Sequence, residues 1–115
     1  MVLVKKLLMQ AEIIVTGSEL LLGEVVDTNS AFIARRLRSI GLDLYYKTTV
    51  GDNVGRMVEA LERALQRSDV IITTGGLGPT VDDVTRQAVA QATGRALVFR
   101  PELLEQVAAR FRAYG

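Results

Sequence analysis

Residues 70–83, VIITTGGLGPTVDD, join a short apolar stretch to a glycine-rich turn and two acids. Val70 to Thr73 is apolar and β-branched, which is typical of a strand covered on both faces of a parallel sheet. The glycines that follow permit positive φ and leave backbone N–H groups free to approach an anionic ligand. The turn matches neither a P-loop nor the G-x-G-x-x-G fingerprint. The stretch therefore predicts a parallel strand that ends at a phosphate- or carboxylate-binding turn.

Two further strands are expected upstream of this stretch. Residues 13–16 form a continuous apolar and β-branched run, and residues 44–50 are rich in aromatic and β-branched side chains. The three expected strands begin about 30 residues apart, which is the length of a βαβ unit. The pattern predicts an α/β fold, a Rossmann-like three-layer α/β/α domain with a mostly parallel sheet.

Helical periodicity occupies the segments between and after the strands. Residues 29–40 form one amphipathic stretch, and Val54 to Leu65 has the strongest helical spacing in the chain. A third helix is expected to begin at Thr80 and to end at Gly94. A last helix is expected from Pro101, with Leu97 to Phe99 before it as a short strand or an extended link. We expect the apolar stripes of all these helices to pack in the core, including that formed by Leu104, Val107, Ala108 and Phe111.

In an open parallel sheet, ligands bind beyond the carboxyl ends of the strands, so the loops that follow the strands carry the candidate site. Backbone amides of the glycine turn would hold phosphate, and a helix N-terminus nearby would favour the same charge. Asn29 lies at an expected helix start, where capping and ligand contact are equal alternatives. The candidate ligand-binding residues are Gly17, Ser18, Glu19, Asn29, Gly75, Gly76, Leu77, Gly78 and Thr80.

Acids follow all three expected strands, and we expect them to face one crevice. Carboxylates gathered in this way repel one another unless a cation lies between them, and Mg²⁺ or Mn²⁺ accepts oxygen ligands. Glu19, Asp52 and Asp83 are the candidate metal ligands, and Asp52, Asp82 and Asp83 are the candidate catalytic residues. Capping is the alternative. Asp52 would then cap the helix that begins near Asn53, and Thr80 would cap the third helix with both following acids in its first turn.

Composition excludes several classes of function. The chain has 14 Lys and Arg against 13 Asp and Glu, so a net charge of +1 supplies no broad field for nucleic acid or an anionic membrane. We expect neither as a partner. The absence of His excludes Ser-His-Asp chemistry, and the absence of Cys excludes thiolate metal sites and favours the cytoplasm.

The chain ends suggest a division of the sequence. Residues 1–8 precede the first expected strand and are interpreted as an N-terminal extension. Residues 9–115 are interpreted as the N-terminal portion of one domain that is incomplete at its C-terminus. An incomplete sheet would expose apolar surface, so a homo-oligomer is expected.

Three motifs resemble one family closely: GSELLLGEVVDTN at residues 17–29, VGDN at residues 50–53 and TGGLGPTVDDVT at residues 74–85. They resemble the N-terminal domain of the competence/damage-inducible protein A (CinA) family. That domain is similar to the molybdopterin-binding domain of MoaB- and Mog-like proteins, which shares a GG-x-G turn followed by an acid. The resemblance runs from Met9 to the end of the chain.

The resemblance implies a cytoplasmic domain with metal-dependent ADP-ribose-type pyrophosphatase activity, which acts on a small nucleotide ligand. In the molybdopterin-binding relatives, the acids at the positions of Asp52 and Asp83 matter for function. A first alternative is a non-hydrolytic module that binds molybdopterin or a nucleotide. A second alternative is an oligomerisation or assembly domain.

Overall fold

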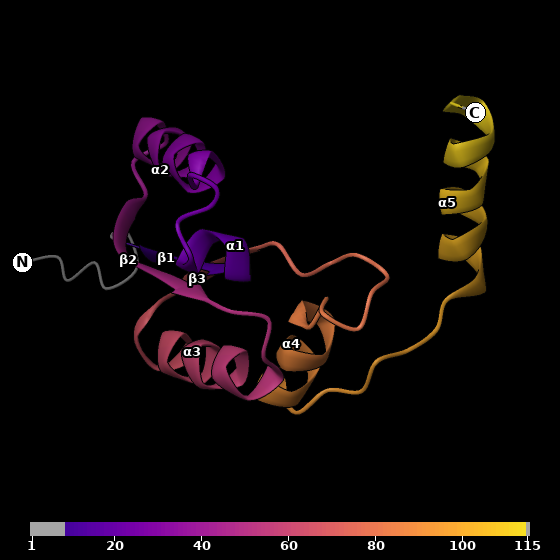
Figure 1. The fold of residues 1–115 in the computed structure, drawn as a ribbon. Coiled ribbons are helices and arrows are strands. Elements are labelled where there is room, and N and C mark those ends of the chain that lie inside the picture. Colours follow the sequence, from indigo (N-terminus) through magenta and orange to yellow (C-terminus); the bar gives the residue numbers. More distant parts are fainter. Residues whose placement is uncertain (1–8, 115) are drawn as a thin grey trace, which may run out of the picture.

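The computed structural model describes residues 9–114, so the expected extension at residues 1–8 lies outside the described residues. Its centre is a sheet of three parallel strands in the order β2-β1-β3 (Figure 1). The strands are β1 (Gln10–Thr16), β2 (Asp43–Val50) and β3 (Val70–Thr74). The three predicted strands and the parallel sheet are confirmed.

Helices cover both faces of this sheet, as the three-layer fold requires. Helix α2 (Thr28–Ser39) lies on one face, and α3 (Val54–Arg67) and α4 (Thr85–Thr93) lie together on the other (Figure 1). A short helix that the sequence analysis did not predict, α1 (Ser18–Leu21), follows β1 directly. The Rossmann-like α/β/α architecture is thus confirmed.

The core lies between the sheet and the α3–α4 layer. Ile14 of β1 and Met57 of α3 are completely buried, as is Ala88 of α4. The apolar spacing of α3 placed this face correctly, except that Leu65 at its end is 49% exposed. Central strand β1 is buried from Ala11 to Thr16 because helices cover both of its faces and strands flank both of its edges.

A partly buried ion pair fixes the end of α3 to the sheet. The Glu12 carboxylate of β1 is completely buried and accepts hydrogen bonds from Arg67 Nε at 3.1 Å and Ser68 Oγ at 2.7 Å. The Arg67 guanidinium also lies over the Tyr46 ring, 3.5 Å from its centroid. The Arg67 hydrogen bond outweighs burial and lowers the pKa of Glu12 below its usual range, so the carboxylate stays charged.

Helix α4 begins five residues later than predicted, so the expectation that it starts at Thr80 is wrong. Its N-cap is Val84, which supplies no side-chain hydrogen bond. Its end was predicted correctly, because Gly94 adopts a left-handed conformation with φ 65°. Residues 95–100 that follow form neither helix nor strand, so the link at Leu97 to Phe99 is extended rather than a strand.

Helix α5 (Pro101–Tyr114) stands apart from the sheet and the other helices (Figure 1). Its predicted start at Pro101 is confirmed, but the expectation that its stripe packs in the core is wrong. Leu104 is 57% exposed, Val107 50% and Phe111 75%. The helical periodicity predicts an apolar face on α5, but it does not predict which surface covers that face. Among residues 9–114 no helix is both long and apolar enough to cross a membrane.

Candidate functional site

The loops that follow β1 and β2 are tied to each other at the carboxyl edge of the sheet. The Ser18 hydroxyl donates to Asp52 Oδ2 at 3.1 Å and accepts from the Asp52 amide at 3.2 Å. The Gly17 amide donates to the Val50 carbonyl at 2.9 Å. Ser18 thus engages the Asp52 carboxylate within the protein.

Asp52 is not the cap of α3, so the capping alternative for this residue is wrong. Asn53 is the N-cap, and its side chain accepts a hydrogen bond from the Arg56 amide at 2.9 Å. Asp52 lies one residue earlier, exposed, with its carboxylate turned toward the loop after β1. A capping role for it is excluded by this neighbour.

The glycine turn after β3 is held tightly from two sides. Gly75 and Gly76 have φ of 85° and 69°, the left-handed region that glycine alone enters without strain. Gly75 lies against the Thr16 carbonyl of β1, where an added Cβ would overlap the oxygen. Thr85, at the start of α4, donates its hydroxyl to the Gly75 carbonyl at 2.8 Å and its amide to the Gly76 carbonyl at 3.2 Å.

The turn leaves donors for a ligand. The amides of Gly76 and Leu77 have no hydrogen-bond acceptor among residues 9–114. Adjacent amides in a turn of this conformation form a concave surface that suits an anion. This arrangement agrees with the expectation that the turn binds phosphate, which stays a prediction.

Asp83 closes the second half of the loop between β3 and α4. Its Oδ2 accepts hydrogen bonds from the Thr80 amide at 2.9 Å and the Thr80 hydroxyl at 2.8 Å. These bonds lower the pKa of Asp83, with smaller contributions from the Gly78 amide and Arg86. Thr80 is therefore a partner of Asp83 within a turn and not the N-cap of α4, and Asp82 lies exposed in the same turn.

A crevice of about 200 Å³ opens between the carboxyl ends of β1 and β3. In the order β2-β1-β3, the chain passes from β1 to the neighbour on one side and then crosses over to β3 on the other side. The strand order therefore switches between β1 and β3, which is where doubly wound sheets bind ligands. The crevice is lined by the ends of β1 and β3, the first turn of α1, the segment before α2 and the first residues of α2. Of the predicted site residues, Glu19, Asn29 and Gly75 line it.

One lining residue that the sequence analysis did not select is Asp27. It is the N-cap of α2, accepts a hydrogen bond from the Ser30 amide at 3.0 Å, and lies 3.6 Å from Lys47 Nζ. The contact with Ser30 is the main cause of its lowered pKa. The sequence signal that could have identified Asp27 is its position as an acid two residues before Asn29, at an expected helix start. Asn29 is not the cap, so its side chain remains available to a ligand.

The three predicted metal ligands do not gather into one set. Glu19 lines the crevice, whereas Asp52 is bonded to Ser18 and Asp83 to Thr80. Across residues 9–114 no group of three His, Cys, Asp or Glu side chains is placed to hold a metal ion. The residues as arranged do not fit a divalent metal held by these carboxylates.

Residues 12–114 match the family described as "Probable molybdopterin binding domain". The chain belongs to this molybdopterin-binding domain family. The match spans both strand-end loops and the glycine turn, so the site described above lies within the family's domain.

Two solved structures place the domain more closely within this family. A CinA protein of unknown function from Thermoplasma acidophilum is 33% identical with a TM-score of 0.85, over 90% of this chain and 62% of that one. The tungsten cofactor synthesizing protein MoaB from Pyrococcus furiosus is 27% identical with a TM-score of 0.67, over 74% of this chain and 53% of that one. The recognised likeness to CinA and to MoaB-like domains is confirmed.

Sequence relatives agree with the structural ones. A competence-damage inducible protein from Caldicellulosiruptor saccharolyticus is 50% identical over 107 residues, which are 93% of this chain and 26% of that protein. One from Halothermothrix orenii is 52% identical over 103 residues. The chain therefore spans about a quarter of the length of the curated relatives it matches.

Proposed function

We propose that this molybdopterin-binding family domain binds the phosphate of a small nucleotide- or pterin-type ligand at the glycine turn. The observation that carries the proposal is the pair of unbonded amides at Gly76 and Leu77, which directly follow Gly75 in the lining of the switch-point crevice. Backbone amides fixed in this geometry stabilise an anion without a cationic side chain. The family to which the chain belongs supports the same ligand class.

The crevice accounts for the remainder of the ligand. Its volume of about 200 Å³ is below the roughly 300 Å³ of small ligand pockets, so it accommodates part of a ligand. Glu19 offers a carboxylate and Asn29 an amide there, and both accept hydrogen bonds from hydroxyl or amino groups. A ribose or a pterin ring presents such groups, whereas an apolar ligand does not.

Binding is favoured over hydrolysis as the main activity because Asp52 and Asp83 already have partners inside the protein. A pyrophosphatase reaction supported by Mg²⁺ or Mn²⁺ remains our second proposal. It requires that Ser18 and Thr80 release these carboxylates when metal and ligand arrive together. The cytoplasm, where such ligands occur, is the proposed location.

A Gly76→Val variant is expected to bind ADP-ribose at least about tenfold more weakly than the parent chain. The added side chain would overlap the Thr85 hydroxyl and shift the free amides of the turn. Isothermal titration calorimetry with ADP-ribose and with inorganic pyrophosphate measures the loss. Thr80→Ala, which removes only a contact to Asp83, is expected to leave binding within about twofold.

Two further measurements keep this test decisive. Glu19→Gln changes an exposed side chain in the crevice without altering the turn, so it should weaken ADP-ribose while leaving pyrophosphate unchanged. Parent-like affinity in both variants would contradict the proposed site. The same samples assayed with Mg²⁺ for AMP and ribose 5-phosphate, detected through a coupled phosphatase, separate the proposals, since metal-dependent turnover would assign the domain to hydrolysis.

Assembly is a third candidate function, and the observation that favours it is the exposed face of α5. Leu104, Val107, Phe111 and Tyr114 follow the 3-4 spacing of a coiled-coil seam, and all are half exposed or more. Acidic Glu102 and Glu105 occupy the first half of this helix, and Arg110 and Arg112 occupy the second. An antiparallel pair of such helices would oppose unlike charges.

If α5 drives self-association, Phe111→Glu should convert a concentration-dependent dimer of the chain to a monomer. A charge in the seam is desolvated in the pair, whereas Ala113→Glu, on another side of the same helix, should leave the dimer intact. Sedimentation velocity over a hundredfold concentration range checks both. A parent chain that stays monomeric throughout would refute the assembly role.

A further inference from the structure

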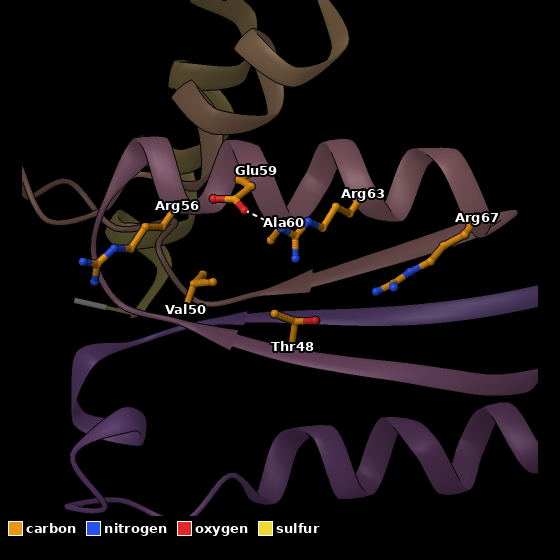
Figure 2. Close-up of a pocket in the computed structure, with 7 residues that line it drawn as sticks. All are labelled: Thr48, Val50, Arg56, Glu59, Ala60, Arg63 and Arg67. Carbon is orange, nitrogen blue, oxygen red and sulfur yellow. Dashed lines mark hydrogen bonds and ion pairs between the residues drawn. The ribbon is translucent and has the colours of Figure 1, made fainter.

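A second cavity lies away from the crevice, on the face of the sheet that α3 covers and near the edge strand β2. It has a volume of about 340 Å³ and lies between β2 and α3 (Figure 2). Thr48 and Val50 of β2 form its floor, and Arg56, Arg63 and Arg67 of α3 extend over it. We call this cavity the arginine groove. It shares no lining residue with the crevice.

The groove runs beside an open edge of the sheet. Strand β2 is outermost in the order β2-β1-β3 and, among residues 9–114, pairs only with β1. Its eight residues therefore present a row of backbone N–H and C=O groups on the outer side. Side chains alternate along a strand, which puts Thr48 and Val50 on the α3 side and Lys47 on the α2 side.

Positive charge dominates this edge. Three arginines and one glutamate line the groove. Arg67 forms an ion pair with the buried Glu12, but Arg56 forms no ion pair within the part of the chain that the structure describes. Arg63 pairs with Glu59 at 2.8 Å with side chains 69% and 62% exposed, a surface contact that an incoming acid can replace at little cost.

The spacing of the arginines indicates an elongated ligand. Arg56 and Arg63 are two helical turns apart, which is about 10 Å along the axis. A lone phosphate reaches only one of them. Acids on one side of an extended chain recur every 6–7 Å or so, and flexible Arg side chains of α3 can meet a series of them.

We propose that the arginine groove and the outer edge of β2 bind an acidic segment of a partner protein in extended conformation. The segment adds a strand beside β2, so main-chain hydrogen bonds supply affinity. Its acidic side chains on the α3 side pair with Arg56 and Arg63, which sets the preference for acidic sequences. The surface is independent of the crevice, so the proposal does not rest on the ligand proposed there.

A labelled peptide of about nine residues with alternating Glu and Thr tests this surface by fluorescence anisotropy on the whole chain. We expect it to bind, and an alternating Lys and Thr peptide not to bind. Arg56→Gln combined with Arg63→Gln should weaken the acidic peptide at least about tenfold, because both charge-assisted contacts are lost. Arg35→Gln with Arg38→Gln, exposed on α2, is the matched control and should leave affinity unchanged.

Two further acidic peptides distinguish strand addition from charge attraction alone. Each is N-methylated on every second amide, and the two differ in which set of alternate amides carries the methyl groups. One register should lose binding because methylation removes its donors to β2. Equal binding of both methylated forms would overturn the proposal in favour of a general polyanion surface. The proposal would also be overturned if the acidic peptide did not bind or if the α2 control lost as much affinity. It would be overturned as well if the Arg56 and Arg63 changes abolished a dimer of the chain.

Discussion

A Gly75→Ala variant is expected to lose about 4 kcal/mol or more of its free energy of unfolding, which is exceptional for the addition of one methyl group. The left-handed conformation at φ 85° costs an L-residue about 1–2 kcal/mol. The larger cost is steric, because the new Cβ overlaps the Thr16 carbonyl. That oxygen belongs to Thr16, the last residue of the central strand, which pairs with Val50 of β2, so moving it disturbs that pairing.

Urea unfolding followed by circular dichroism measures this loss. Gly94→Ala is the matched control, because Gly94 has a similar φ of 65° and no atom within 4 Å of the added Cβ. It should cost only the left-handed penalty, about 1 kcal/mol. Equal losses in the two variants would mean that the contact between Gly75 and Thr16 contributes nothing.

An Arg67→Met variant is expected to lower Tm by roughly 10 °C or more. The change leaves the Glu12 carboxylate buried beside one remaining donor, Ser68, without its cation. Because the Arg67 side chain is 37% exposed, solvent moderates the loss below that of a fully enclosed pair. Differential scanning calorimetry at neutral pH gives the shift.

Two controls isolate the buried charge. Arg63→Met removes a cation from the same helix whose partner Glu59 is exposed, so Tm should hardly change. Glu12→Leu combined with Arg67→Met replaces the pair with apolar groups and should recover much of the lost stability. An Arg67→Met variant as stable as the Arg63→Met control would refute the role given to the pair.

The same pair sets a pH dependence. The folded state lowers the pKa of Glu12, so the unfolded state binds the proton more readily. The stabilisation is therefore complete above the unfolded pKa, from about pH 5 upward, and is lost as pH falls through the lowered folded pKa. In Arg67→Met the Tm should decline less steeply on acidification than in the parent, because protonation now relieves an unpaired charge.

The sheet and its helical covers were predictable because their signals are local. The β-branched run at residues 13–16 and the helical spacing of Val54, Met57 and Leu61 each lie within one element. The side chains of that element alone therefore indicate which of its faces is buried. The start of α4 was not predictable in this way. Thr80 looks like a cap, but Asp83 accepts both its amide and its hydroxyl hydrogen and closes a separate turn.

The candidate site was predictable to the level of loops and not of side chains. Parallel strands bring Glu19, Asp52 and Asp83 to one edge, yet chain order does not say which acids find local donors. Ser18 and Thr80 engage two of the three, so no metal set forms among the described residues. For α5, Leu104 and Phe111 have the spacing of a core helix, and spacing carries no information about what covers it.

The central position of β1 has a consequence for the order of events in folding. Ala11 pairs with Leu44 on one side and with Val70 on the other, so the sheet is made entirely of contacts between distant parts of the chain. Such topology slows folding, because loop closure precedes any gain from pairing. During synthesis the strand at residues 10–16 leaves the ribosome before both of its partners. Its edge toward β2 stays open until residue 50 has followed, and its edge toward β3 until residue 74 has followed. During that interval the unpaired strand edges are open to aggregation with other chains.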